Sequence, residues 1–118
     1  MSRRKDKEYV LDMLTACENI LNYKKGYDFE RFIGDRKTQD AIIRNIEIIG
    51  EAVKHISENI KEKYQEVEWK EIAKTRDKLI HSYFGIDLDI LWDIINMDIP
   101  RLKNKIKEII QKEGWNKK

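Results

Sequence analysis

Hydrophobic residues recur every three or four positions along most of the chain, which is the pattern of helices that bury one face. One such stretch covers about residues 5–25, and a second begins near residues 35–38 and ends at about residue 59. Residues 27–35 between them are predicted to form a loop whose apolar side chains pack into the core. No stretch alternates apolar and polar residues as a strand would, so the pattern predicts an all-α fold.

The second half of the chain continues the helical pattern. A polar connection at residues 60–68 leads to a third helix that opens near Trp69, and Asp87 or Asp89 is suited to cap a fourth. Short connections between amphipathic helices favour antiparallel neighbours. The predicted architecture is therefore an up-and-down bundle of four to five helices.

Two residues are expected to shape this bundle locally. Pro100 removes a backbone donor and crowds the preceding turn, so a helix is predicted to break near Asp98. Asp98 would then cap a restarted helix that Gly114 closes. Gly50 lies beside the apolar stripe of the second helix, where the absence of a side chain predicts the close approach of another helix.

Composition is consistent with one domain over residues 1–118, with a core at about 7–112 and basic ends. The chain carries 24 Lys and Arg against 22 Asp and Glu, a net charge of +2. The excess is concentrated at the ends, with net +3 over residues 1–7 and net +5 over residues 101–118. Such ends either follow a phosphate backbone or serve as solubilising tails.

Other features argue against several classes of protein. The single cysteine, Cys17, excludes an intrachain disulfide, and no Cys and His residues have the spacing of zinc ligands. No apolar run is long enough for a membrane span, and the N-terminus lacks the apolar core of a signal peptide. We therefore expect a cytoplasmic protein without membrane association, bound metal or cofactor.

Acidic residues and a histidine share one face of the second predicted helix. Glu47 and Glu51 are one turn apart, and His55 is one turn further on. Such a set is able to hold a metal or share a proton, but it more often forms a solvated face. A third alternative is that one of the carboxylates neutralises Arg76 on the next helix.

Arg76 departs from the pattern that folding alone requires, because it lies near the middle of an apolar stripe. A guanidinium in such a position needs an anion, either a carboxylate of the protein or the phosphate of a ligand. His81 follows five residues later and Tyr83 two residues after that. The alternatives are a snorkelling or ion-paired arginine, a histidine at a helix C-terminus and a tyrosine in the core.

Helical geometry constrains how these residues would meet. At about 100° per residue, Arg76 and Tyr83 share one line, whereas His81 is rotated by roughly 140° from Arg76. Both therefore reach one phosphate only if the helix loosens before Gly85, or if a second copy of the chain completes the pair. Asp77 is four residues from His81, so it either orients the imidazole or is an ordinary surface acid.

The segment from Arg76 through His81 to Tyr83, with four residues and then one residue between them, resembles the motif of the HepT-like toxins. These proteins are a branch of the HEPN superfamily of helical ribonucleases. The similarity continues in flanking blocks, in order along the chain: Ile48 to Ala52, Trp69, Tyr83 to Asp87, Trp92, and Asp98 to Pro100.

The resemblance implies a metal-independent endoribonuclease that acts as a homodimer, with Arg76 and His81 of both protomers as catalytic residues. It further implies the toxin of a type VII toxin–antitoxin system, in which a nucleotidyltransferase antitoxin AMPylates Tyr83. The expected partners are an RNA substrate, a second copy and that antitoxin. The alternatives are a catalytically silent HEPN bundle that binds nucleotides or the nucleotidyltransferase, and a plain dimeric scaffold.

Overall fold

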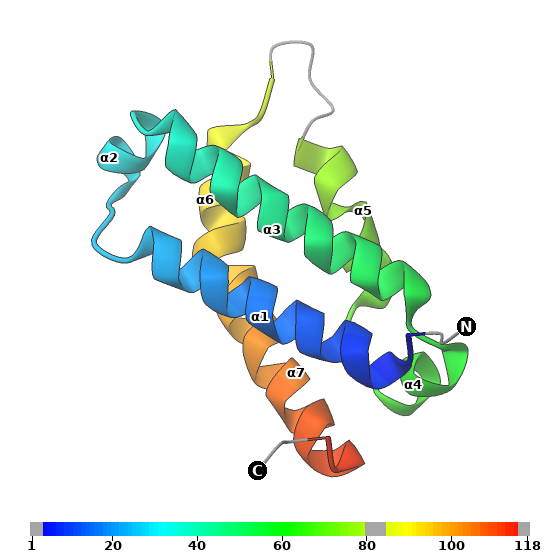
Figure 1. Ribbon diagram of the computed structural model, residues 1–118. Coiled ribbons are helices and arrows are strands. Elements are labelled where there is room, and N and C mark those ends of the chain that lie inside the picture. Colours follow the sequence, from blue (N-terminus) through cyan, green and yellow to red (C-terminus); the bar gives the residue numbers. More distant parts are fainter. Residues whose placement is uncertain (1–3, 80–84, 116–118) are drawn as a thin grey trace.

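The computed structural model describes residues 4–79 and 85–115, and every regular element in this part is a helix. The predicted all-α class is confirmed. Figure 1 shows the arrangement of the elements. They are, in order, α1 (Asp6–Lys24), α2 (Phe29–Ile33), α3 (Arg36–His55), α4 (Glu58–Lys63), α5 (Trp69–Leu79), α6 (Leu88–Asp93), the π-helix η1 (Ile94–Asp98) and α7 (Ile99–Glu113).

The longest helices, α1 and α3, run antiparallel and side by side, while α5 packs on α3 and α7 packs on α1 (Figure 1). Their apolar stripes meet in one core, as the periodicity predicts. The largest fully buried side chains come from these four helices and from α6, and they include Met13, Ile20, Ile42, Leu79, Leu91, Ile106 and Ile109. Burial of these stripes supplies most of the favourable free energy of folding.

Two segments predicted to be loops or connections contain short helices, so that part of the prediction was wrong. In the first, the Asp28 carboxylate accepts the backbone N–H of Arg31, which starts α2. Phe32 is then fully buried against Trp92, with 5.0 Å between the ring centroids. A cap and one buried aromatic therefore fold five residues that are too few for a periodic pattern.

The second short helix, α4, also changes the residue at which α3 ends. The Ser57 hydroxyl accepts the N–H of Ile60 and caps α4, so α3 ends at His55 and not at residue 59. The Asp6 carboxylate accepts hydrogen bonds from the backbone and hydroxyl of Ser57, at 2.9 and 2.7 Å. The start of α1 is thereby tied to this turn.

Pro100 does not interrupt the last helix, which contradicts the predicted break at Asp98. The chain is helical from α6 through η1 into α7, and the Asp98 side chain makes no capping hydrogen bond. In η1 the N–H of Ile99 donates to the carbonyl of Ile94, five residues back. This wider turn ends two residues before the proline, so the missing donor and the bulky ring fall in the first turn of α7, where the helical ladder is already shifted.

Gly50 lies where α3 and α5 come together, which confirms the predicted close approach. A Cβ atom built on Gly50 would lie 3.8 Å from the carbonyl oxygen of Ala73 and 3.9 Å from that of Ile72. Both distances are ordinary van der Waals contacts with backbone atoms. The backbones of α3 and α5 are therefore close at this point, with room for about one methyl group between them.

A polar cluster fastens the end of α4 to the end of α7. The hydroxyl of buried Tyr64 donates to a carboxylate oxygen of Glu113 at 2.5 Å, and Lys63 Nζ lies 2.8 Å from the same oxygen. Hydrogen bonds from Lys63 and Tyr64 lower the pKa of Glu113, while burial raises the pKa of Tyr64 to about 12. The carboxylate is therefore held ionised between a cation and a neutral phenol.

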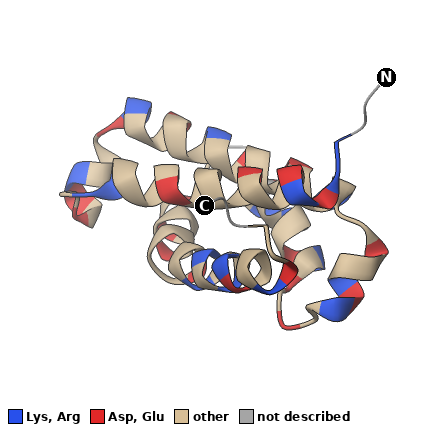
Figure 2. Cartoon of the chain, turned by 60° about the horizontal axis from the view of Figure 1, so that its bottom comes forward, with Lys and Arg blue, Asp and Glu red and all other residues tan. Residues whose placement is uncertain are grey.

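Cys17 lies on the buried face of α1 with no exposed surface. Burial raises the pKa of its thiol to about 12. Acidic and basic positions are interspersed along the helices rather than separated on two faces (Figure 2). Within residues 4–79 and 85–115, no helix is both long and apolar enough to cross a membrane.

We predict that Gly50→Ala leaves the fold intact and stabilises it by up to about 1 kcal/mol, because alanine favours a helix and its methyl fits. Gly50→Leu should instead destabilise the protein by about 1–3 kcal/mol, since the longer side chain pushes α5 from α3. Urea denaturation measures both. Gly34→Leu at an exposed position is the matched control, and equal losses in the two leucine variants would contradict the contact.

We predict that Glu113→Gln lowers Tm at pH 7 by about 3–5 °C. Because the folded pKa of Glu113 is lowered, its contribution is present above the ordinary value of 4.5 and is lost as pH falls through the lowered pKa. The Tm difference between wild type and variant should therefore shrink as pH falls below that ordinary value. Exposed Glu108→Gln is the control, and a pH-independent difference would contradict the assignment.

Candidate functional site

The helix α5 carries the first part of the motif, and hydrogen bonds to the preceding residues hold its start in place. Trp69 is buried, and its indole N–H donates to the carbonyl of Tyr64 at 3.1 Å. The N–H of Ile72 donates to the carbonyl of Glu68 at 3.0 Å, which closes the first turn. One turn later Ala73 rests on Gly50 of α3, and fully buried Leu79 holds the other end. The motif helix is therefore anchored at three points.

The structure locates only part of the predicted site. Arg76 lies within α5, and its side chain is outside the described part of the structure. His81 and Tyr83 also lie outside the described residues. Gly85, the predicted helix stop, has φ of 106°, a backbone conformation that favours glycine. The convergence of Arg76 with His81, and any contribution of a second copy, remain predictions.

Asp77 faces a hollow of about 500 Å³ that we call the Asp77 hollow. Residues of α1, α3 and α5 line it, among them Ala73 and Gly50. Glu47 and Glu51 line it from α3, so the structure brings these carboxylates to the motif helix as the sequence suggested. The remaining lining residues are Arg4, Tyr9, Asp12, Arg44, Ile48, Ala52 and Lys54.

The outer part of the Asp77 hollow is a solvated charged face. The carboxylate of Glu51 is 66% exposed and lies 3.1 Å from Nε2 of His55, whose ring stacks on Tyr9 at 5.0 Å. Glu47 is less exposed, with Arg44 at 3.9 Å. The solvated-face interpretation is thus confirmed for Glu51. Among the described residues, no three His, Cys, Asp or Glu side chains are grouped to hold a metal.

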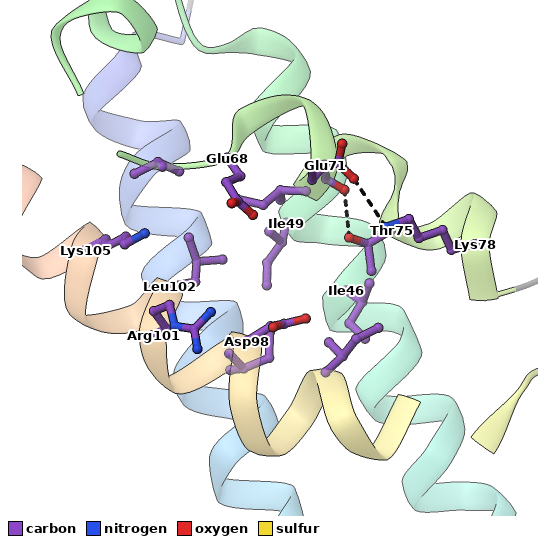
Figure 3. Close-up of a pocket in the computed structure, with 14 residues that line it drawn as sticks. Ile46, Ile49, Glu68, Glu71, Thr75, Lys78, Asp98, Arg101, Leu102 and Lys105 are labelled. Atoms are coloured by element: carbon purple, nitrogen blue, oxygen red, sulfur yellow. Dashed lines mark hydrogen bonds and ion pairs between the residues drawn. The ribbon is translucent and has the colours of Figure 1, made fainter. Parts of the chain in front are cut away.

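A second depression lies on another side of α5, and we call it the Lys78 groove (Figure 3). It is a cavity of about 190 Å³ bounded by α3, the connection between α4 and α5, α5, η1 and α7. Its floor is apolar, and charged side chains of both signs surround the mouth. The apolar residues are Ile46, Ile49, Val67, Ile72, Ile94, Ile99 and Leu102; the polar ones are Glu68, Glu71, Thr75, Lys78, Asp98, Arg101 and Lys105.

Some of the charged groups at the Lys78 groove are paired within the protein. Lys78 Nζ lies 3.2 Å from a carboxylate oxygen of Glu71, and Lys105 Nζ donates to the carbonyl of Glu66 at 2.7 Å. The side chains of Glu68, Asp98 and Arg101, in contrast, make no hydrogen bond or ion pair within residues 4–79 and 85–115.

Sequence reasoning missed the Lys78 groove, because its walls come from segments far apart in the chain. Glu68 belonged to a predicted connection, Asp98 to a predicted cap and Arg101 to a basic end. The one available signal was the spacing of Arg101 and Lys105, which puts two cations on one side of α7.

Comparison with known proteins identifies the class. A family model described as "Ribonuclease HepT-like" matches residues 13–109. "Putative RNase TTE0752" of Caldanaerobacter subterraneus subsp. tengcongensis is 47% identical over 105 residues, which cover 89% of this chain and 94% of that protein. "Probable ribonuclease HepT" of Thermococcus cleftensis is 45% identical over 107 residues, covering 91% and 97%.

A third relative, "Putative RNase MJ0127" of Methanocaldococcus jannaschii, is 41% identical over 111 residues, which cover 94% of this chain and 92% of that protein. No solved structure matches the chain. The all-α bundle and the matched region together define a helical ribonuclease of the HEPN type. Within that class, the chain belongs to the HepT-like ribonuclease family.

Proposed function

We propose that this protein is a metal-independent endoribonuclease that acts as the toxin of a type VII toxin–antitoxin system in the cytoplasm. The observation that carries the proposal is the motif itself. Arg76 lies on an anchored helix inside the region that the ribonuclease family model matches, and His81 and Tyr83 follow at the family's spacing. Arg76 and His81 are the proposed catalytic residues.

The chemistry follows from the residues and from RNA. The 2′-oxygen attacks the adjacent phosphorus, the bond from phosphorus to the 5′-oxygen breaks, and a 2′,3′-cyclic phosphate and a 5′-hydroxyl result. One imidazole accepts the proton of the 2′-hydroxyl, and an imidazolium donates a proton to the leaving oxygen. Histidine is suited to both duties because its ordinary pKa lies near neutrality. Arg76 stabilises the charge that builds on the non-bridging oxygens.

The two proton transfers require two histidines, and a homodimer supplies one His81 from each copy. Within one regular helix, His81 is rotated by roughly 140° from Arg76, so a second copy is the direct way to bring both groups to one phosphate. Arg76 and Asp77 lie within α5, and His81 lies outside the described residues. Asp77 is proposed to support His81 from one turn earlier.

Tyr83 is proposed as the site at which a nucleotidyltransferase antitoxin silences the enzyme. Its phenolic oxygen attacks the α-phosphorus of ATP, AMP is transferred and pyrophosphate leaves. In a helix Tyr83 shares the line of Arg76, so the added phosphate competes with RNA for that guanidinium. Regulation would then act through the same anion site as catalysis.

We predict that the purified protein cleaves single-stranded RNA in the presence of EDTA, leaves 2′,3′-cyclic phosphate ends and does not cut DNA of the same sequence. Arg76→Ala and His81→Ala should each lower the cleavage rate by about a hundredfold or more, because each removes a group that acts in the transition state. A fluorescent RNA oligonucleotide resolved on a gel measures the rates.

Matched controls come from residues of the same type on α3. His55→Ala and Arg36→Ala remove an exposed histidine and an exposed arginine, and both should cleave as the wild type does. If all variants keep wild-type cleavage, or if the wild type leaves RNA intact while binding it, the catalytic assignment is wrong. The second result would favour a silent binding partner of the nucleotidyltransferase.

We predict that a cognate nucleotidyltransferase with ATP adds one adenylyl group to the wild type and abolishes cleavage. Tyr83→Phe should remain unmodified and active, whereas Tyr23→Phe, which changes a tyrosine with 41% exposure on α1, should be modified like the wild type. Intact-protein mass spectrometry measures the addition. Modification of Tyr83→Phe would move the site to another residue.

A further inference from the structure

The Lys78 groove has the size and lining of a site for one planar base. Its volume of about 190 Å³ is below the range of pockets that hold drug-sized ligands, and Ile49 and Leu102 form an apolar floor (Figure 3). A helix or a folded partner could not enter such a space, whereas a single base could lie on the isoleucine and leucine side chains. The lining thus favours a planar base that is apolar on its faces and polar at its edges.

The charged mouth of the groove indicates a ligand that carries both an anion and N–H donors. Arg101 has a planar guanidinium without a partner among the described residues, and phosphate matches its fork geometry. Glu68 and Asp98 are likewise without partners, and ionised carboxylates only accept hydrogen bonds. A plain polyanion would be repelled by these two carboxylates, so the phosphate has to come with a donor-rich group.

Guanine is the base that meets this requirement. Its Watson–Crick edge presents two adjacent donors, the ring N–H and the exocyclic amino group, which together match one carboxylate. Adenine and cytosine offer an amino group beside an acceptor nitrogen, and uracil places its single N–H between two carbonyl oxygens. A carboxylate beside uracil would therefore face like charge. Splayed bases of single-stranded RNA are commonly recognised through this edge.

The π-helix provides an independent indication of function at the same place. The η1 turn contributes Ile94 and Asp98 to the groove, and it connects helices that would otherwise continue in regular register. π turns are uncommon and occur frequently at functional sites, because they displace side chains from the positions that an α-helix would give them. Here the π turn η1 carries Asp98, and Arg101 follows it in the first turn of α7.

From these observations we infer that the Lys78 groove binds a guanine nucleotide of the RNA strand. The base lies on Ile49 and Leu102 with its edge toward Glu68 and Asp98, and its phosphate is held by Arg101 and Lys105. The identity of the strand rests on the proposed function, whereas binding of the nucleotide does not. Because α5 forms one wall, a strand held here lies beside the motif helix, and cleavage near guanines follows.

The direct test is a titration of the full chain with GMP, IMP, AMP, CMP and UMP, followed by methyl resonances of isoleucine and leucine. GMP should shift Ile49 and Leu102 and bind about tenfold more tightly than UMP. IMP lacks only the exocyclic amino group, so its weaker binding isolates that contact. Equal affinities for all five nucleotides, or shifts confined to other residues, would overturn the proposal.

Substitutions separate the base contact from the phosphate contact. Glu68→Gln and Asp98→Asn should abolish the preference for GMP over IMP, and Arg101→Gln should weaken GMP binding while leaving guanosine binding unchanged. Glu108→Gln and Lys107→Gln change exposed residues of α7 that do not line the groove, and they should bind GMP as the wild type does. Circular dichroism melting confirms that each variant folds. Unchanged GMP selectivity in the folded Glu68 and Asp98 variants would refute the assignment.

Cleavage of RNA distinguishes this proposal from the enzymatic one. In oligonucleotides with one guanosine, replacing it by inosine should raise KM about tenfold with little change in kcat if the base binds in the strand. If GMP binds but inosine has no effect on cleavage, the groove takes the free nucleotide and the assignment to the strand is wrong. If GMP binds and no RNA is cut, the ribonuclease proposal fails while nucleotide binding stands.

Discussion

The contact between α3 and α5 at Gly50 is the constraint on which the arrangement of this protein depends. At Gly50 the carbonyls of Ile72 and Ala73 lie within van der Waals reach of a single methyl group built on the α3 backbone, so the two helices pack closely there. The motif helix is thereby fixed as a rigid support rather than as a loop. Two depressions lie beside α5: Asp77 borders one, and the next residue, Lys78, borders the other.

Much of the fold could be predicted because hydrophobic periodicity is a local and repeated signal. The buried stripes of α1, α3 and α7 follow the three- and four-residue spacing of the sequence, and Gly50 marked a helix contact. The resemblance to HepT-like ribonucleases rested on the order of motif and flanking blocks, and family membership bears it out. The roles of Arg76, His81, Asp77 and Tyr83 stay predictions.

What could not be predicted depends on contacts between distant segments or on single hydrogen bonds. The five residues of α2 are too short for periodicity and are folded by the Asp28 cap and the burial of Phe32. Pro100 was expected to end a helix, and only the preceding π turn shows how the chain continues. The Lys78 groove combines residues of four helices and of the connection before α5, so no window of sequence contains it.

The position of Cys17 bears on how copies of this chain would be held together. The thiolate is the nucleophile in disulfide exchange, and a thiol whose pKa is raised to about 12 is almost entirely protonated at neutral pH. It is also shielded within the core, and the chain has no other sulfhydryl group. A disulfide between two copies through Cys17 is therefore disfavoured, and a dimer of this chain would be held by noncovalent contacts.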